Sequence, residues 1–175
     1  MPSRFPLLSH TNDDLLAVGA ALDDCTRENG CLLMLPGSHR WPILDRHQDG
    51  VFVGAIDIER EGVDVPGAVP VTVGAGDITL HRARMLHASP PHTSSLPRRL
   101  LLLQLAAVDA WPVMGVSDLV QFNSWVLRDE RTTRYRVAEM DIRLPLPKHE
   151  RQGRISEIQT LFRPKRFAGA PSSRG

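Results

Sequence analysis

The feature that most constrains this chain is its series of short apolar segments, each about as long as a β-strand and each followed by turn residues. Six of them are separated by Gly, Pro, Asn or Asp, at residues 15–22, 31–35, 51–58, 69–73, 78–81 and 99–107. No helix-length segment with an apolar stripe lies between them, so strands do not alternate with helices. The pattern predicts an all-β sandwich or open barrel.

Turn residues predict how some of these segments pair. Asn29-Gly30 supplies the positive φ of a tight reversal, so the first two segments are expected to be antiparallel neighbours. Pro70 cannot donate to a strand ladder, which favours an edge position for residues 69–73. Residues 85–96 carry prolines and hydroxyl side chains, and we expect them to form a loop across the mouth of the fold.

The stretch from residue 76 to residue 105 places His87, Ser89 and Arg98 between two predicted strands. A neutral imidazole is a good ligand for Fe(II), and two histidines with one carboxylate form the ligand set of non-haem iron oxygenases. An Arg guanidinium matches a carboxylate bidentately. Taken singly, such residues are more often a loop histidine and a solvated arginine. In this spacing they indicate half of a site that holds a metal and a dicarboxylate together.

Composition indicates a globular protein without a polyanionic partner. The chain has 175 residues and a formal net charge of +1, which favours one domain and no nucleic-acid binding. A denser set of arginines at residues 128–136 is typical of a solvated helix face. Cys25 and Cys31 have no second pair of cysteines, so neither a disulfide framework nor a zinc site is indicated. No apolar run approaches the roughly 18 residues of a membrane span, and the default expectation is a soluble cytoplasmic protein.

Four motifs in order resemble the phytanoyl-CoA dioxygenase family of Fe(II)- and 2-oxoglutarate-dependent oxygenases. They are Ala21-Leu22-Asp23-Asp24, Glu28-Asn29-Gly30-Cys31-Leu32, Pro36-Gly37-Ser38-His39, and the block from Gly76-Asp77 to Arg98. The resemblance implies an all-β double-stranded β-helix, or jelly-roll, with its core at residues 13–107. It also implies that the protein hydroxylates a small organic substrate with O₂. Fe(II) would be the cofactor and 2-oxoglutarate the cosubstrate.

The resemblance assigns roles to single residues where they match the family's motif. His87 matches the distal iron-binding histidine, and Ser89 matches the hydroxyl that stands beside the arginine that binds 2-oxoglutarate. Arg98 matches the arginine that grips the far carboxylate of 2-oxoglutarate. Arg99 is the competing choice, and the eleven-residue spacing from His87 favours Arg98.

The chain departs from the family pattern at the other iron ligands. The family has a His-x-Asp pair before the strand at residues 15–22, where this chain has His10-Thr11-Asn12-Asp13. The pair of His10 and Asn12 offers an amide in place of the carboxylate, and Asp13 has the wrong strand parity relative to His10. We therefore expect a jelly-roll that is incomplete at its N-terminus, either beginning just after the ligand strand or with its first nine residues in place of that strand.

His47-Gln48-Asp49 is a second His-x-Asp sequence, and on a strand its two ligand side chains would share one face. It lies where the family has a variable loop and is followed by Gly50, so we interpret it as a polar loop, with relocated iron ligands as the alternative. His39, His81 and His92 are interpreted as turn, strand-end and loop residues.

Two further hypotheses belong to other classes of protein. The first is a non-catalytic, truncated jelly-roll paralogue that acts as a binding or scaffold protein, and the missing His-x-Asp pair separates it from the enzyme. The second is a cupin-like metal-binding module without 2-oxoglutarate. In each case we expect one domain at residues 1–162, with an irregular or partly helical extension at residues 108–162 and a disordered tail at residues 163–175.

Overall fold

A computed structural model describes residues 9–63 and 66–147 of the chain. They form two compact units. The larger unit contains residues 9–43 and 66–142, and the smaller unit contains residues 44–63 and 143–147. The single domain expected for residues 1–162 stays a prediction.

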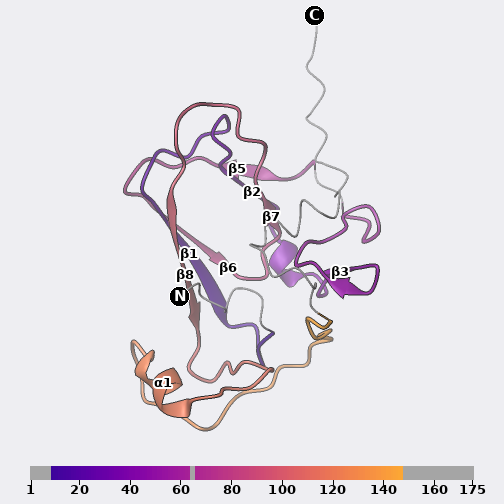
Figure 1. The fold of residues 1–175 in the computed structure, drawn as a ribbon, viewed down its shortest axis with the longest axis vertical. Coiled ribbons are helices and arrows are strands. Elements are labelled where there is room, and N and C mark those ends of the chain that lie inside the picture. The colour runs from indigo at the N-terminus through magenta and orange to yellow at the C-terminus, as the bar shows by residue number, and fades with distance from the viewer. Residues whose placement is uncertain (1–8, 64–65, 148–175) are drawn as a thin grey trace, which may run out of the picture. The chain divides into compact units, whose positions relative to one another are not determined.

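The larger unit is built from two antiparallel sheets of three strands each (Figure 1). The first sheet has the order β6-β1-β8, with β6 at Ile78–Arg82, β1 at Leu15–Ala21 and β8 at Leu100–Ala106. The second has the order β5-β2-β7, with β5 at Val69–Val71, β2 at Leu32–Met34 and β7 at His87–Ala88. The chain changes sheet after β1, β5, β6 and β7. This winding of six strands in two sheets confirms the predicted all-β fold. The incompleteness expected at the N-terminus stays a prediction.

One face of the first sheet packs on a small core. Ala21 of β1 is buried with Cys25 and Cys31, which follow in the turn after β1, and Leu100 packs against them. Small residues of β1 let the neighbouring strand approach closely. A Cβ atom at Gly19 would lie 2.8 Å from Oγ1 of Thr79, whose hydroxyl donates to the Gly19 carbonyl at 3.2 Å.

The other face of the first sheet is apolar and exposed. Val18 of β1 pairs with Leu80 of β6 on one side and with Leu103 of β8 on the other. Leu80 is 65% exposed and Leu103 is 47% exposed. Because side chains alternate along a strand, the exposed residues of this face form one contiguous group. This apolar face comprises Ile78, Leu80, Leu101, Leu103 and Leu105.

Three expectations about strand pairing and extent are wrong. β1 and β2 are not neighbours, because the turn of residues 22–31 carries the chain into the second sheet instead of folding it back as a hairpin. Residues 85–96 include β7, whose two residues pair with β2. Only Val51–Phe52 of the predicted strand at residues 51–58 is extended, as β4 of a hairpin with β3, His47–Gln48. The edge position predicted for residues 69–73 is confirmed, because β5 is the outer strand of its sheet.

The C-terminal extension is irregular, with one short helix. Helix α1 spans Leu119–Ser124 and is N-capped by Asp118, whose side chain accepts from the Gln121 amide at 2.9 Å. Residues 128–136 are exposed and irregular, so the helix face predicted for this arginine-rich segment is wrong. The tail at residues 163–175 lies outside the described residues.

No helix among the described residues is long and apolar enough to cross a membrane. The cytoplasmic location expected from the sequence stays a prediction. The two free thiols, Cys25 and Cys31, are both buried in the larger unit.

We expect the chain to self-associate through its apolar face, because a contiguous exposed apolar surface is a contact site. Replacing Leu80 and Leu103 together with Thr should lower the concentration-dependent association measured by light scattering. Leu102→Thr is the control, because Leu102 lies on the opposite face of the same strand and is also exposed. A wild-type sample that stays monomeric and unfolds in one cooperative transition would contradict this expectation.

Candidate functional site

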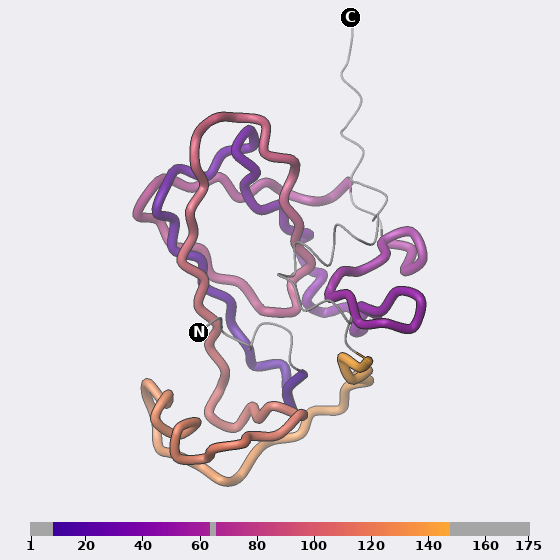
Figure 2. The backbone as a smooth tube through the Cα atoms, in the orientation of Figure 1, coloured from indigo at the N-terminus to yellow at the C-terminus, as the bar shows by residue number. Residues whose placement is uncertain are grey.

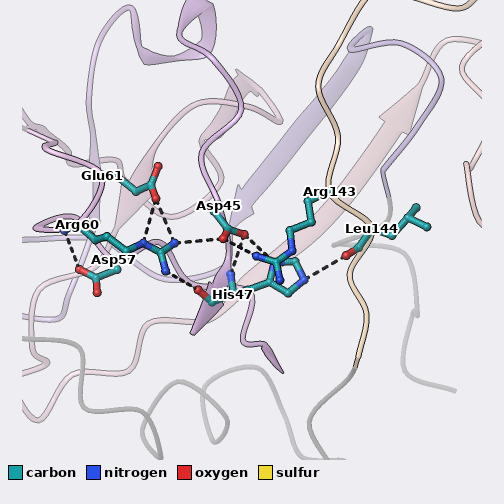
Figure 3. A network of polar contacts seen from close by, with 7 residues as sticks. All are labelled: Asp45, His47, Asp57, Arg60, Glu61, Arg143 and Leu144. Atoms are coloured by element: carbon teal, nitrogen blue, oxygen red, sulfur yellow. Dashed lines mark hydrogen bonds and ion pairs between the residues drawn. The ribbon is translucent and has the colours of Figure 1, made fainter. Parts of the chain in front are cut away.

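His47 is a buried structural residue of the smaller unit, where both of its ring nitrogens are engaged (Figure 3). Its Nδ1 lies 2.6 Å from Oδ1 of Asp45, and its Nε2 lies 3.1 Å from the carbonyl oxygen of Leu144. Asp49 occupies the turn between β3 and β4 with a φ of 51°, followed by Gly50 at 77°. Because residue 49 has left the strand, its carboxylate does not share the face of His47. His47–Gln48 is therefore a short strand where we expected a polar loop, and the contacts of His47 favour a structural role over relocated iron ligands.

Asp45 is the centre of a charged cluster around His47 (Figure 3). Its Oδ2 accepts from Arg60 at 3.2 Å and from Arg143 at 2.8 Å. Partial burial of Asp45 acts to raise the pKa of its carboxyl, but hydrogen bonds from the His47 ring and amide outweigh burial, so the pKa lies below its ordinary value. The cluster ties the hairpin to the segment that follows residue 142 within the same unit.

The residues at the expected position of the family's His-x-Asp pair hold the fold together. Asn12 is 1% exposed, and its Nδ2 donates to the carbonyls of Asp109 at 3.1 Å and of Arg136 at 3.2 Å. Asp13 pairs with Arg84 at 3.0 Å. Both side chains therefore have structural partners, in agreement with the interpretation that neither forms a chelating pair with His10.

His87 begins β7 and is exposed, with one ring nitrogen available. Its Nδ1 lies 2.9 Å from the Met85 carbonyl oxygen. A carbonyl oxygen can only accept, so Nδ1 carries the hydrogen, and Nε2 of the neutral ring keeps a free lone pair. Metal-binding histidines are commonly oriented by such a bond from the second nitrogen. The ring is therefore in a tautomer suited to a metal ligand.

A second imidazole lies beside His87. The ring of His81, near the end of β6, packs edge-on against that of His87 with centroids 5.5 Å apart. Burial, and to a smaller extent the proximity of His87, lowers the pKa of His81, so its ring is neutral at neutral pH. Nδ1 of His81 is buried and has no hydrogen-bond partner among the described residues.

The loop from Ser89 to Pro97 is attached to the turn that follows β1 (Figure 2). The amides of Thr93 and Ser94 both donate to the carbonyl of Glu28, at 2.8 and 3.1 Å. The loop thus connects β7, which carries the candidate metal ligand His87, to Arg98 and Arg99, the two candidates for binding a carboxylate. Ser89 is exposed and follows β7 directly, so it has the same strand parity as His87.

Arg98 and Arg99 differ sharply in their surroundings. Arg99 forms a fork with Asp23, with Nε to Oδ2 and Nη2 to Oδ1 both at 2.8 Å. Arg98 is half-buried, and its Nη1 is buried without a hydrogen-bond acceptor among the described residues. A buried guanidinium nitrogen without an acceptor is costly unless a ligand supplies one. The Arg99 guanidinium is already bonded to Asp23, whereas the Arg98 guanidinium is free to donate to a carboxylate.

The charge of Arg98 is felt by the two buried thiols of the turn. Burial raises the pKa of the Cys25 thiol, and the positive charge of Arg98 opposes that rise. Burial also raises the pKa of the Cys31 thiol, which Arg27 and Arg98 oppose. The Arg98 charge therefore acts on both buried thiols.

The described residues include candidates for part of an iron site. Fe(II) in an oxygenase needs two imidazoles and a carboxylate on one face of its coordination sphere. No group of three His, Cys, Asp or Glu side chains converges within residues 9–63 and 66–147. His87 fits one position of such a site, and Arg98 fits the remote end of a dicarboxylate. The roles of His87, Ser89 and Arg98 stay predictions.

Comparisons with known proteins bear on the same segment. The family model described as phytanoyl-CoA dioxygenase (PhyH) matches residues 3–100. A protein of Stutzerimonas stutzeri named probable alpha-ketoglutarate-dependent hypophosphite dioxygenase is 35% identical over 162 residues, which are 90% of this chain and 57% of the relative. Methylphosphonate hydroxylase of Gimesia maris is 34% identical over 88 residues, which are 50% of this chain and 32% of the relative. The chain thus spans less than two thirds of the length of either relative.

Among solved structures, EvdO2 from Micromonospora carbonacea var. aurantiaca, complexed with 2-oxoglutarate, is 30% identical. The match has a TM-score of 0.45 and covers 66% of this chain and 44% of EvdO2. A structure of EctD from S. alaskensis with bound Fe is 26% identical, with a TM-score of 0.45 and coverage of 55% of this chain and 33% of EctD.

We expect His47→Ala to destabilise the protein by about 1–3 kcal/mol, because it leaves the Leu144 carbonyl and the Asp45 carboxylate without a buried partner. Asp49→Asn should change the free energy of unfolding by less than about 0.5 kcal/mol, since Asn tolerates positive φ in a turn. Urea unfolding of both variants measures the difference. Equal losses in the two would contradict the structural role of His47.

The Asp23–Arg99 fork predicts a stability change at low pH. Hydrogen bonds from the side chain and amide of Arg99 lower the pKa of Asp23 from 3.8 to about 2. The ionised form is therefore favoured by folding, and its contribution is complete above pH 3.8 and lost as pH falls through about 2. In unfolding measured from pH 7 to pH 2, the difference between wild type and Asp23→Asn should be constant down to about pH 4 and then shrink. A difference that persists unchanged at pH 2 would show that the fork is not what lowers this pKa.

Proposed function

This chain belongs to the phytanoyl-CoA dioxygenase family, and we propose that it carries the 2-oxoglutarate end and the distal iron ligand of an Fe(II)/2-oxoglutarate-dependent dioxygenase. The observation that carries the proposal is Arg98. Its spacing from His87 makes it the candidate for the family's cosubstrate arginine, and its Nη1 is buried without an acceptor among the described residues while Arg99 beside it is occupied.

Arg98 would hold the far carboxylate of 2-oxoglutarate through charge-assisted hydrogen bonds, and Ser89 would donate its hydroxyl to the same carboxylate. An Arg–carboxylate contact is bidentate and is strengthened where water is excluded. The half-buried position of Arg98 favours this role over that of an exposed surface cation.

His87 would supply Nε2 to the iron, with Nδ1 held by the Met85 carbonyl. Iron, when bound, supplies the oxidation of the substrate by O₂. The described residues do not contain the rest of the facial set, so activity requires two further ligands from outside them. The role of this chain's own residues is to orient one imidazole and to fix the cosubstrate.

We propose that the substrate is a small phosphorus oxyanion. The proposal rests on the names of the two relatives, which act on hypophosphite and methylphosphonate. The first of these matches 90% of this chain, including the extension beyond β8. A long-chain acyl-CoA, which the family's name suggests, has weaker support, because a relative named phytanoyl-CoA dioxygenase 1 matches only 49% of this chain.

A second candidate function is favoured by the incomplete ligand set. In a non-catalytic paralogue the same scaffold would bind 2-oxoglutarate or a similar dicarboxylate without turning it over. An anaerobic Fe(II) titration followed by a succinate assay separates the two. Succinate formation that is lost with His87→Ala and kept with Asp49→Ala supports the enzyme, and no succinate from any of the three proteins supports the binding protein.

Arg98→Ala should weaken 2-oxoglutarate binding by about 1.5–3 kcal/mol, the range for a hydrogen bond to a charged group. Isothermal titration of 2-oxoglutarate into the full chain measures the change. Arg99→Ala should have a smaller effect, because its guanidinium is held by Asp23. Binding that is lost with Arg99→Ala and intact with Arg98→Ala would transfer the role to Arg99.

A further inference from the structure

We propose that Asp23 is a positioning residue for the cosubstrate site. By gripping Arg99 it would hold the neighbouring Arg98 in the orientation that receives the far carboxylate of 2-oxoglutarate. This inference rests on the role proposed for Arg98, and it concerns a residue that does not itself touch the cosubstrate.

Asp23 fixes both the backbone and the side chain of Arg99. Its Oδ2 accepts from the Arg99 amide at 2.8 Å and from Nε at 2.8 Å, and its Oδ1 accepts from Nη2 at 2.8 Å. The Leu22 amide in turn donates to the Arg99 carbonyl at 3.0 Å. Residues 22 and 23 therefore bind residue 99 as an extension of the β1–β8 ladder, and the fork sets which way its side chain points.

The orientation of Arg98 follows from that of Arg99. Adjacent residues of an extended chain point to opposite sides, so Arg99 on the Asp23 side leaves Arg98 on the other. Nη1 of Arg98, which we place on that other side, is buried without an acceptor among the described residues. If the fork were absent, either arginine could turn outward and be solvated, which removes the cost of the unpaired nitrogen.

The residue before Arg98 is tied to the same turn by a second side chain. Asn29 is 1% exposed, and its Nδ2 donates to the carbonyl of Asp24 at 2.7 Å and to that of Pro97 at 3.4 Å. Arg98 therefore lies between two neighbours that are both anchored on residues 23–29. The turn after β1 thus acts on Arg98 from both sides, while Arg98 keeps its own side chain free.

Stability alone does not account for the fork. The Arg99 side chain is 70% exposed although that of Asp23 is only 16% exposed, and ion pairs with one solvated partner contribute little to folding. When Asp23 is replaced by Ala, the electrostatic effect and the loss of positioning change the affinity for 2-oxoglutarate in opposite directions. Removing a negative charge near a site for a dianion should strengthen its binding by Coulomb attraction, whereas loss of positioning should weaken it. The sign of the change therefore identifies the mechanism.

The test is isothermal titration of 2-oxoglutarate into the full chain and into Asp23→Ala, Arg99→Ala and the double variant. We expect each single variant to bind roughly three- to tenfold more weakly, as modest misplacement of a binding group allows. The double variant should bind no more weakly than either single one, because both remove the same fork. Asp24→Ala is the matched control. It removes the same charge one residue away, where the carboxylate accepts from the Ala75 amide at 2.8 Å, and it should leave binding unchanged or tighter.

Thermal unfolding of each variant confirms that it is folded. Arg99→Lys keeps the charge and loses the fork, so it carries the test if Asp23→Ala does not fold, and it should also weaken binding. Unchanged or tighter binding by Asp23→Ala, or additive losses in the double variant, would overturn the inference. If Arg98→Ala weakens binding but Asp23→Ala and Arg99→Lys have no effect, the positioning role of Asp23 is refuted while the proposed cosubstrate site stands. Unchanged binding by Arg98→Ala would refute the proposed cosubstrate site itself.

Discussion

The larger unit depends on β1 being paired along both of its edges. Leu15–Ala21 is bonded to β6 on one side and to β8 on the other, so it is the central strand of the first sheet. Its register with β8 sets Ala21 opposite Leu100. The same register brings Asp23, two residues after Ala21, next to Arg99, the residue before Leu100. A slip of one residue would exchange the two faces of β8 and turn Arg98 to the outside.

Much of this fold could be predicted from the sequence because apolar runs and turn residues are local signals. The first and last strands, the edge position of the Pro70 strand and the loop after His87 all follow from such signals. The choice of Arg98 over Arg99, made from spacing, agrees with the different environments of the two side chains. Strand pairing was harder, since the partners of β1 lie some sixty and eighty residues away and no local pattern specifies them.

Other features were not predictable, for physical reasons. Two-residue strands such as β3 and β7 are too short to show a period of two. Asp23 looks like an ordinary turn residue beside Asp24, and its contacts with Arg99 far along the chain cannot be predicted from the local sequence. His47 resembles a ligand in sequence, but the acceptors that engage its ring come from Asp45 nearby and from Leu144 far along the chain. In each case a distant partner decides the function of the residue.

The two buried thiols make the turn after β1 accessible to a kinetic measurement. Cys25 and Cys31 lie at the base of the segment that carries Asp23 and Asn29, and burial raises the pKa of both thiols, so a thiol reagent has little thiolate to attack in the closed fold. Modification must therefore await local opening of the turn. The labelling rate measures how often that opening occurs, and with it how rigidly Arg98, the proposed carboxylate ligand, is held on the timescale of ligand exchange.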